Sequence, residues 1–217
     1  MEFAVDVRGV SRRYGRRWAL ADVSLRVPAG SVAMITGANG SGKSTLLRIL
    51  ATAIRPDLGT ALVGGFDVTK EREDVRRVTA LLSHYSYLYE ALSARENLNV
   101  GPALSRPGID AGPAESRPYI SLLLERVGLS ARADDPVATY SAGMRKRLSF
   151  ARVLAQNASI VLLDEPYGQL DPEGFRLVDE VVEELRGKAT IIMATHQVER
   201  VGKFADVRVE LEQGRVR

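Results

Sequence analysis

Nine consecutive residues have the types and the spacing of a loop that binds phosphate groups: Gly37, Ala38, Asn39, Gly40, Ser41, Gly42, Lys43, Ser44 and Thr45. They match G-x-x-x-x-G-K-[ST] between an apolar run and a helical pattern, which is the context that this pattern requires. Glycine allows the necessary backbone angles and the close approach of N–H groups to phosphate oxygens. Lys43 would contact the β and γ phosphates, and the Ser44 hydroxyl would ligate Mg²⁺. The alternative is a glycine-rich turn with an incidental lysine.

Two adjacent carboxylates follow a second apolar run. Asp164 and Glu165 come directly after Ile160–Leu163, at the expected carboxyl end of a buried strand, where open parallel sheets bind ligands. Because successive strand residues point to opposite faces, we expect the two acids to have different roles. Asp164 would reach the metal ion, and Glu165 would face the γ phosphate and polarise the attacking water. A capping or turn acid at a strand end is the alternative.

Three further segments would complete a site for a nucleoside triphosphate. One helix opens with a serine cap, small residues and a basic first turn, which is a start suited to an anion: Ser141, Ala142, Gly143 and Met144. Leu170-Asp171 follows the tandem acids, and His196 follows the apolar run Thr190–Ala194. His196 would contact the γ phosphate and hold the water and Glu165 in register. An ordinary capped helix and a satisfied loop histidine are the alternatives.

The elements that must position these residues alternate between strands and helices. Alternating apolar and polar residues predict antiparallel strands at 5–7 and 23–27, whereas apolar runs predict buried strands at 32–35, 160–163 and 190–194. A further strand is expected at 78–82. Helical spacing covers 44–54, 116–127, 142–156 and 172–186, and a Gly/Pro/Ala-rich loop is expected between Gly101 and Pro118.

These elements predict an α/β fold with a P-loop core and a mixed, mainly parallel sheet. We expect an N-terminal antiparallel β region within a core of about residues 1–84 and 158–217. The remaining segment, about residues 85–157, is expected to form an inserted helical subdomain that carries the serine-capped helix.

Composition narrows the class of protein. With 217 residues and 45% hydrophobic content, the chain can form one substantial core with a satellite lobe. No run approaches the length of about 20 apolar residues that a membrane-spanning helix needs, and the start does not resemble a signal peptide, so we expect a cytoplasmic protein. The absence of cysteine excludes disulfides and thiolate sites. The net charge of +3 comes from basic residues interleaved with acids, so no nucleic-acid partner is expected.

In their order and spacing, these motifs resemble those of ABC transporter ATP-binding subunits, across essentially the whole chain. The resemblance implies that residues 37–45 are the Walker A loop and that residues 160–165 form Walker B. It implies that Ser141 to Met144 are the signature motif, that Leu170-Asp171 is the D-loop and that His196 is the switch histidine. Tyr14 is at the position of the aromatic residue that stacks on adenine, a contact that tolerates any flat base.

The same resemblance implies a mechanism that uses ATP and Mg²⁺. Two copies would bind head to tail around ATP as a nucleotide-dependent homodimer, in which the signature motif and Asp171 of one copy contact the ATP held by Lys43 of the other. Glu165 would activate water, and His196 would steady the arrangement. An integral-membrane permease would dock on the helical subdomain, so the chain would be peripheral on the inner face of the cell membrane.

Two segments depart from the family pattern. The signature has Ala142 and Met144 where glycine and glutamine are usual, although Ser141 and Gly143 are kept. The loop after residues 78–82 usually carries a glutamine that senses Mg²⁺ and the permease, and here Tyr85 occupies that position. A phenol cannot replace an amide carbonyl as a metal ligand at neutral pH, so sensing would run through water, His84 or Ser86.

The cargo class depends on a finer resemblance. The short chain, the sensor loop with His84 and the Tyr-Ser-Ala-Gly-Met signature resemble the haem exporter ATP-binding subunit of cytochrome c maturation. Another bacterial exporter ATPase, for drugs, lipids or polysaccharide, is the first alternative. A non-transport ATPase of the cell-division type is the second, and a binding module without catalysis is the third. Lys43, Asp164, Glu165 and His196 argue against the third.

Overall fold

The computed structural model describes residues 2–105 and 113–217 of the chain, without the side chains of residues 101–117. The chain divides into two compact units. The sheet unit comprises Met1–Ser83, Ala158–Pro166 and Glu180–Arg217, and the helical unit comprises His84–Asn157 and Tyr167–Asp179. Among the described residues, no helix is long and apolar enough to cross a membrane.

The sheet unit contains two β-sheets. The four-stranded sheet is antiparallel and has the order β2-β1-β4-β5: β1 (Phe3–Tyr14), β2 (Arg17–Pro28), β4 (Leu58–Val63) and β5 (Phe66–Asp67). The six-stranded sheet has the order β10-β9-β3-β8-β7-β6 and is parallel except for β10: β3 (Val32–Thr36), β6 (Thr79–Leu82), β7 (Ile160–Asp164), β8 (Thr190–Ala194), β9 (Val207–Glu212) and β10 (Arg215–Val216).

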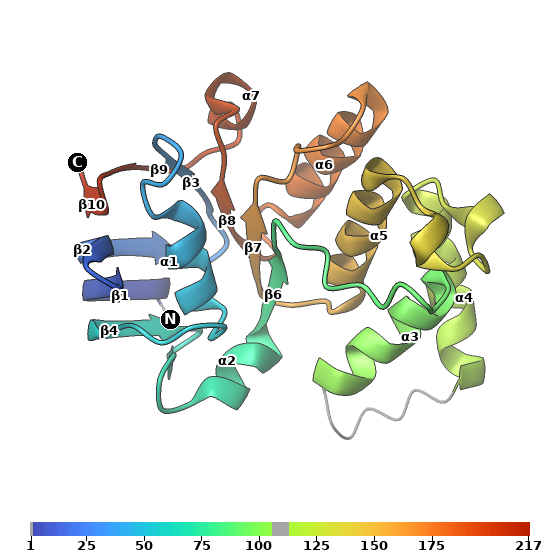
Figure 1. Ribbon diagram of the computed structural model, residues 1–217, viewed down its shortest axis with the longest axis horizontal. Coiled ribbons are helices and arrows are strands. Elements are labelled where there is room, and N and C mark those ends of the chain that lie inside the picture. The colour runs from blue at the N-terminus through green and yellow to red at the C-terminus, as the bar shows by residue number, and fades with distance from the viewer. Residues whose placement is uncertain (1, 106–112) are drawn as a thin grey trace. The chain divides into compact units, whose positions relative to one another are not determined.

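One helix joins the two sheets into a common core. Helix α1 (Lys43–Leu50) lies against β2 and β4 on one side and β7 and β8 on the other (Figure 1). Its Leu46, Leu47, Ile49 and Leu50 are fully buried. Burial of each such side chain contributes about 1.5–3 kcal/mol. Every residue of β7 and β8 is buried, as expected for central parallel strands covered on both faces. The nine-residue loop is therefore followed directly by core residues, which start at Leu46.

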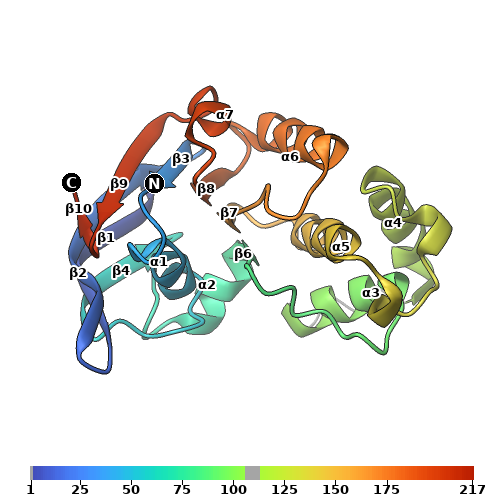
Figure 2. The same cartoon turned by 45° about the horizontal axis from the view of Figure 1, so that its top comes forward.

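Helices dominate the helical unit. Helices α3 (Ala94–Ser105), α4 (Pro113–Arg126) and α5 (Ala142–Ala155) lie side by side (Figure 2), and two short 3₁₀ turns, Ser130–Arg132 and Val137–Thr139, connect α4 to α5. Helix α6 (Pro172–Leu185) begins in this unit and ends in the sheet unit. Two other helices, α2 (Arg72–Val78) and α7 (Val198–Gly202), belong to the sheet unit.

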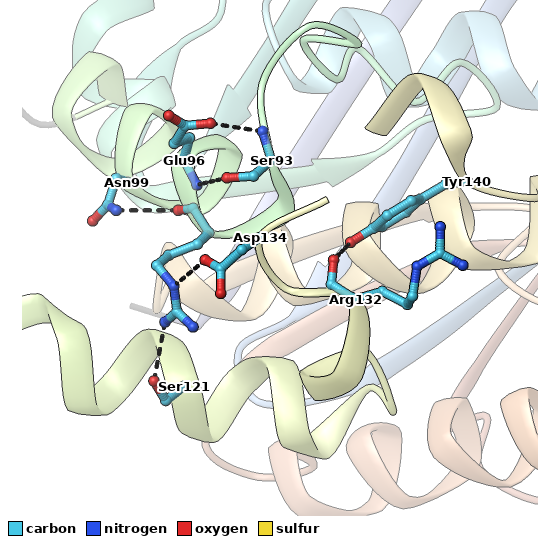
Figure 3. A network of polar contacts seen from close by, with 8 residues as sticks. Ser93, Glu96, Asn99, Ser121, Arg132, Asp134 and Tyr140 are labelled. Atoms are coloured by element: carbon cyan, nitrogen blue, oxygen red, sulfur yellow. Dashed lines mark hydrogen bonds and ion pairs between the residues drawn. The ribbon is translucent and has the colours of Figure 1, made fainter. Parts of the chain in front are cut away.

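Polar contacts fix the start of α3 (Figure 3). Ser93 and Glu96 form a reciprocal capping box, in which Ser93 N–H donates to Glu96 Oε2 (2.7 Å) and Glu96 N–H donates to Ser93 Oγ (3.2 Å). Between them, Arg95 donates to Asp134 Oδ1 (2.9 Å) and to Ser121 Oγ (3.1 Å). The guanidinium therefore ties α3 to α4 and to the loop before α5.

The predicted α/β fold, with its antiparallel N-terminal region and inserted helices, is confirmed, but several boundaries were wrong. The helix predicted at 44–54 ends at Leu50, because Thr52 has a φ of 58°. Val78 ends α2 and is not in a strand. The predicted loop at 101–118 is too long, because α3 continues to Ser105 and α4 begins at Pro113; its middle, residues 106–112, is outside the described residues.

Residues 167–179 belong to the helical unit, although the sequence analysis placed them in the core. The reason is visible in their contacts with α5. Arg147 of α5 donates to Asp171 Oδ1 (2.7 Å) and to Glu173 Oε2 (3.2 Å). Such contacts depend on the tertiary fold, so the linear pattern of residues could not indicate them.

Asp206 anchors the strand that leads into the nine-residue loop. Its carboxylate accepts from the N–H of Val32, the first residue of β3 (2.9 Å), and from Arg186 (2.6 Å). Burial alone would raise the pKa of Asp206, but the Val32 N–H and the Arg186 guanidinium outweigh it, so the pKa lies below the usual 3.8.

Asp206→Asn should lower the free energy of unfolding at about pH 7 by about 1 kcal/mol. This value is at the low end of the range for a hydrogen bond to a charged group, because the carboxylate is partly exposed. A carboxyl whose pKa is lowered on folding stabilises the protein above its unfolded pKa. This contribution is lost as the pH falls through the folded value. Urea unfolding should therefore show the wild type and the variant converging in acid; a constant difference would contradict this role.

Candidate functional site

The nine-residue loop runs from the end of β3 to the start of α1, and two of its glycines face neighbouring backbone. A Cβ on Gly37 (φ 136°) would lie 2.0 Å from the Leu211 carbonyl oxygen. A Cβ on Gly42 (φ 111°) would lie 2.4 Å from the Ala19 carbonyl oxygen. Contacts under 3 Å with backbone atoms cannot be relieved by rotating a side chain. The strands β2 and β9 therefore require glycine at both positions.

Lys43 is buried, with 6% of its surface exposed, and its ammonium group contacts the loop itself. Its Nζ donates to the carbonyl oxygens of Gly37 (2.7 Å) and Ala38 (3.1 Å). A buried cation requires such partners because desolvation disfavours its charge. The ammonium group therefore lies against the backbone of the loop, where a phosphate group bound by the loop would meet it.

Ser41 provides a test of whether this loop fits an anion. Its Oγ is buried and has no hydrogen-bond partner among the residues that the structure describes. Buried hydroxyls normally have a partner, and an orphaned one indicates a missing ligand or water. A phosphate oxygen would accept a hydrogen bond from this hydroxyl and satisfy it. The loop therefore fits a phosphate group, and this argument is independent of the sequence pattern.

Ser44 and Asp164 meet beside the loop. Ser44 Oγ donates to Asp164 Oδ1 (2.8 Å), and Asp164 is 2% exposed. Two protein oxygens of this kind suit Mg²⁺, which takes one or two protein ligands and fills its octahedron with phosphate oxygens and water. No group of three acidic, histidine or cysteine side chains forms a metal cage within residues 2–105 and 113–217. The pair is therefore suited to a metal ion that arrives with a phosphate ligand.

Glu165 and His196 form a second pair. His196 Nδ1 lies 2.9 Å from Glu165 Oε2. Glu165 has a φ of 46°, a left-handed conformation that is costly for a residue with a side chain and that clusters at functional sites. The alternation argument was wrong for Glu165, since β7 ends at Asp164. The two acids nevertheless have different neighbours, because this turn directs Glu165 towards His196.

Thr195 holds the histidine loop, and the sequence analysis missed it. Its side chain is fully buried, its N–H donates to the Ile35 carbonyl (3.1 Å) and its Oγ1 accepts from Gln197 N–H (3.0 Å). This hydroxyl turn fixes the backbone on both sides of His196. Its sequence signal was available, since a threonine directly after an apolar strand favours such a turn.

Tyr14 lies at the end of β1 in the same unit and is 47% exposed. Half-exposed aromatic rings of this kind can stack on a flat base. The structure therefore places the predicted base-stacking residue, the phosphate loop, Asp164, Glu165 and His196 in the sheet unit.

The predicted signature residues lie in the helical unit at the start of α5. Ser141 is the N-cap, and its Oγ accepts from Met144 N–H (3.2 Å). A Cβ on Gly143 would lie 3.2 Å from the Gln169 carbonyl oxygen, so the helix start lies close to the segment before α6. The predicted capped helix is present, and its first turn is placed beside the Leu170-Asp171 segment.

Asp171 already has partners within its own unit. Its Oδ1 accepts from Gly174 N–H (2.8 Å), which caps α6, and from Arg147 (2.7 Å). The Gly174 N–H and then the Arg147 guanidinium lower the pKa of Asp171. Arg147 also contacts Glu173, whereas the sequence analysis had treated the basic first turn of this helix as suited to an anion. The structure instead makes Arg147 the link between α5 and the start of α6.

The predicted sensor residues begin the helical unit. The rings of His84 and Tyr85 contact edge to face, with centroids 5.6 Å apart. Tyr85, Tyr87 and Tyr89 are 61%, 63% and 50% exposed. These side chains therefore form an exposed aromatic segment.

The loop between a buried strand and a helix, with its buried lysine and the serine–aspartate pair, defines a P-loop nucleoside triphosphatase. Residues 20–168 match the sequence profile of the ABC transporter family. The chain belongs to the ABC transporter family, and its fold is that of solved ATP-binding cassettes.

Relatives and solved structures agree with this assignment. The daunorubicin resistance ATP-binding protein DrrA3 of Streptomyces coeruleorubidus is 37% identical over 98% of this chain and 66% of its own length. The phosphonates import ATP-binding protein PhnC of Frankia casuarinae is 34% identical over 98% of this chain and 88% of its own. The chain spans 64 to 66% of the length of three daunorubicin resistance relatives.

Two solved structures share the fold. An ATP-binding subunit of an ABC transporter has a TM-score of 0.88 and 27% identity, over 98% of this chain and 88% of the other. An ATP-binding cassette dimer in a post-hydrolysis state with ADP and Pi has a TM-score of 0.86 and 25% identity, over 98% and 96% of the two chains.

Gly37→Ala should abolish nucleotide binding and lower the free energy of unfolding by about 2–4 kcal/mol, because the added methyl group meets the Leu211 carbonyl. Gly187→Ala is the matched control: φ is also positive (77°), but a Cβ there has no neighbour within 4 Å. It should cost only about 1 kcal/mol and leave nucleotide affinity unchanged. Thermal unfolding and titration with a fluorescent nucleotide measure both effects; equal behaviour of the two variants would refute the steric argument.

Proposed function

We propose that this chain hydrolyses MgATP as the motor subunit of a bacterial exporter and drives a separate membrane permease. One observation carries the proposal: the contact between Glu165 and His196 (2.9 Å) in the unit that also holds Lys43 and the Ser44–Asp164 pair. A nucleotide-binding module without catalysis would not need a carboxylate held in a strained turn beside a histidine.

The site residues of the sheet unit have separate roles in this proposal. The loop N–H groups and Lys43 bind the β and γ phosphates, and Lys43 exchanges its carbonyl partners for phosphate oxygens. Ser44 and Asp164 hold Mg²⁺, which neutralises phosphate charge when bound. Glu165 orients and polarises the attacking water, and His196 holds the Glu165 carboxylate in place and contacts the γ phosphate.

Dimerisation on ATP would complete the site. Ser141, Ala142, Gly143 and Met144 of one copy close over the γ phosphate bound by the other, since a capped helix start presents N–H groups to an anion. The Asp171 carboxylate accepts hydrogen bonds from Arg147 and from Gly174 N–H of its own chain. We therefore propose that the D-loop approaches the partner's nucleotide through other atoms than this carboxylate.

The helical unit is the proposed docking site of the permease, which would hold the chain at the inner face of the cell membrane. The exposed rings of Tyr85, Tyr87 and Tyr89 support this role, because exposed aromatic residues are enriched at protein interfaces. Tyr85 occupies the position of the usual glutamine, and coupling to the metal would run through water, His84 or Ser86.

The daunorubicin resistance relatives support a drug as the cargo, the first alternative of the sequence analysis. Haem export has only the resemblance of the signature and sensor segments in support. Import proteins for phosphonates and for sulfate or thiosulfate are also similar to the chain. The cargo contacts the permease, so this preference rests on kinship and not on the residues of the site.

Glu165→Gln should retain MgATP binding, lower turnover by about 10²–10⁴-fold and accumulate a dimer in size-exclusion chromatography, because the amide cannot accept the proton of water. Glu199→Gln makes the same change on the neighbouring helix α7, and it should hydrolyse ATP normally. Turnover of Glu165→Gln at the wild-type rate would remove Glu165 from its assigned role.

The complex with its permease, purified from membranes, should show ATPase activity that daunorubicin stimulates and haem does not. This outcome is expected if the chain shares the exporter type of its daunorubicin resistance relatives. Stimulation by haem alone would reverse the preference, and co-purification with no multi-span membrane protein would count against a transport role.

A further inference from the structure

Asp57 binds the end of the strand that carries Tyr14. It lies in the connection between α1 and β4, directly before Leu58. Its Oδ1 accepts from Arg12 Nη1 (2.8 Å), its Oδ2 accepts from Arg13 N–H (2.7 Å), and its own N–H donates to the Ser11 carbonyl (2.8 Å). One residue thus holds three consecutive residues that lead to Tyr14.

These bonds add to a strand pairing that is irregular in this region. The pairing of β1 with β2 is irregular between Val10 and Arg12 and again between Arg12 and Arg13. Its pairing with β4 is irregular between Arg8 and Ser11. Irregular pairing leaves backbone groups without ladder partners and bends the strand. Beyond these shifts β1 still pairs with β2 at Arg13↔Trp18 and Tyr14↔Arg17, so Asp57 adds a second support to the β1 end that carries Tyr14.

Arg12 connects Asp57 to the Tyr14 ring. Its guanidinium carbon lies 5.2 Å from the Tyr14 ring centroid, within the range of a cation–π contact. The Asp57 carboxylate fixes this guanidinium. The side chain of Arg12 is 26% exposed, whereas Tyr14 remains 47% exposed. The ring therefore has one side against Arg12 and retains exposed surface for a ligand.

We propose that Asp57 and Arg12 are positioning residues for nucleotide binding, which orient the Tyr14 ring so that it can stack on the base. The inference rests on the proposed function, in which Tyr14 stacks on the base of ATP. Asp57 follows the helix that begins at the phosphate loop, so one short connection links the phosphate site to the base site. A purely structural role of the Asp57–Arg12 pair is the competing explanation.

The base and the triphosphate can be probed separately. Inorganic tripolyphosphate with Mg²⁺ has the phosphate chain without the base, and a non-hydrolysable ATP analogue has both. Calorimetric titration should show that Asp57→Ala and Arg12→Ala each weaken the ATP analogue about tenfold, the loss expected for a stacking contact. Affinity for tripolyphosphate should stay within about twofold, because the phosphate loop is intact.

A double-mutant cycle tests the route through Tyr14. In a Tyr14→Ala background, Asp57→Ala should cause no further loss of affinity for the ATP analogue. Asp6→Ala is the matched control, since Asp6 pairs with Arg8 and Arg26 in the same sheet, and it should leave both affinities unchanged. Trp18, the single tryptophan of the chain, lies 5.6 Å from the Arg13 guanidinium and should change its fluorescence in Asp57→Ala but not in Asp6→Ala.

Each outcome decides the inference. If the variants weakened the binding of both ligands equally, Asp57 would have a structural role. Unchanged affinity for both ligands would overturn the inference. A further loss of affinity in the Tyr14→Ala background would also overturn it. If the wild-type chain bound neither ligand, the proposed function itself would fail. If the wild-type chain bound tripolyphosphate and the variants bound the ATP analogue normally, only the role of Asp57 and Arg12 would be overturned.

Discussion

The site depends on the close approach of neighbouring backbone to the phosphate loop. The Leu211 carbonyl leaves no room for a Cβ at Gly37, and the Ala19 carbonyl leaves none at Gly42. The turn after β9 adds a bond from Gly214 N–H to the Ser41 carbonyl (3.0 Å). A loop that must turn its N–H groups towards a ligand has few internal hydrogen bonds, so its shape must be imposed from outside. The strands β2 and β9 impose it here.

Sheet topology explains why the acids and the histidine lie near this loop. β8 pairs with both β3 and β7, so the carboxyl ends of three parallel strands share one edge. The phosphate loop follows β3, Asp164 ends β7 with Glu165 directly after it, and His196 follows β8. Ligands bind at such edges in open parallel sheets. The Glu165 N–H also donates to the Ala194 carbonyl (2.9 Å), which extends the β7–β8 pairing to the turn where Glu165 meets His196.

Local patterns predicted much of this arrangement, and contacts distant in sequence account for the rest. The glycine loop, the buried strands and the Ser141 cap are properties of short segments, and the sequence predicted them. The sequence analysis did not use the Ser93–Glu96 capping box, a local signal that would have predicted α3. Arg147 and Asp57 could not be identified in this way, because their partners lie 24 and 45 positions away in the chain.

In the helical unit, residues that are proposed to contact the nucleotide of a partner also have roles in folding. A serine hydroxyl both accepts and donates, so Ser141 can cap α5 through Met144 N–H and still donate to a phosphate oxygen. A carboxylate only accepts, and Arg147 and Gly174 already engage that of Asp171. Moving Asp171 to a phosphate would bring two anions together and take one of its two acidic partners from Arg147. Folding and phosphate binding are therefore compatible at Ser141, but they compete at Asp171.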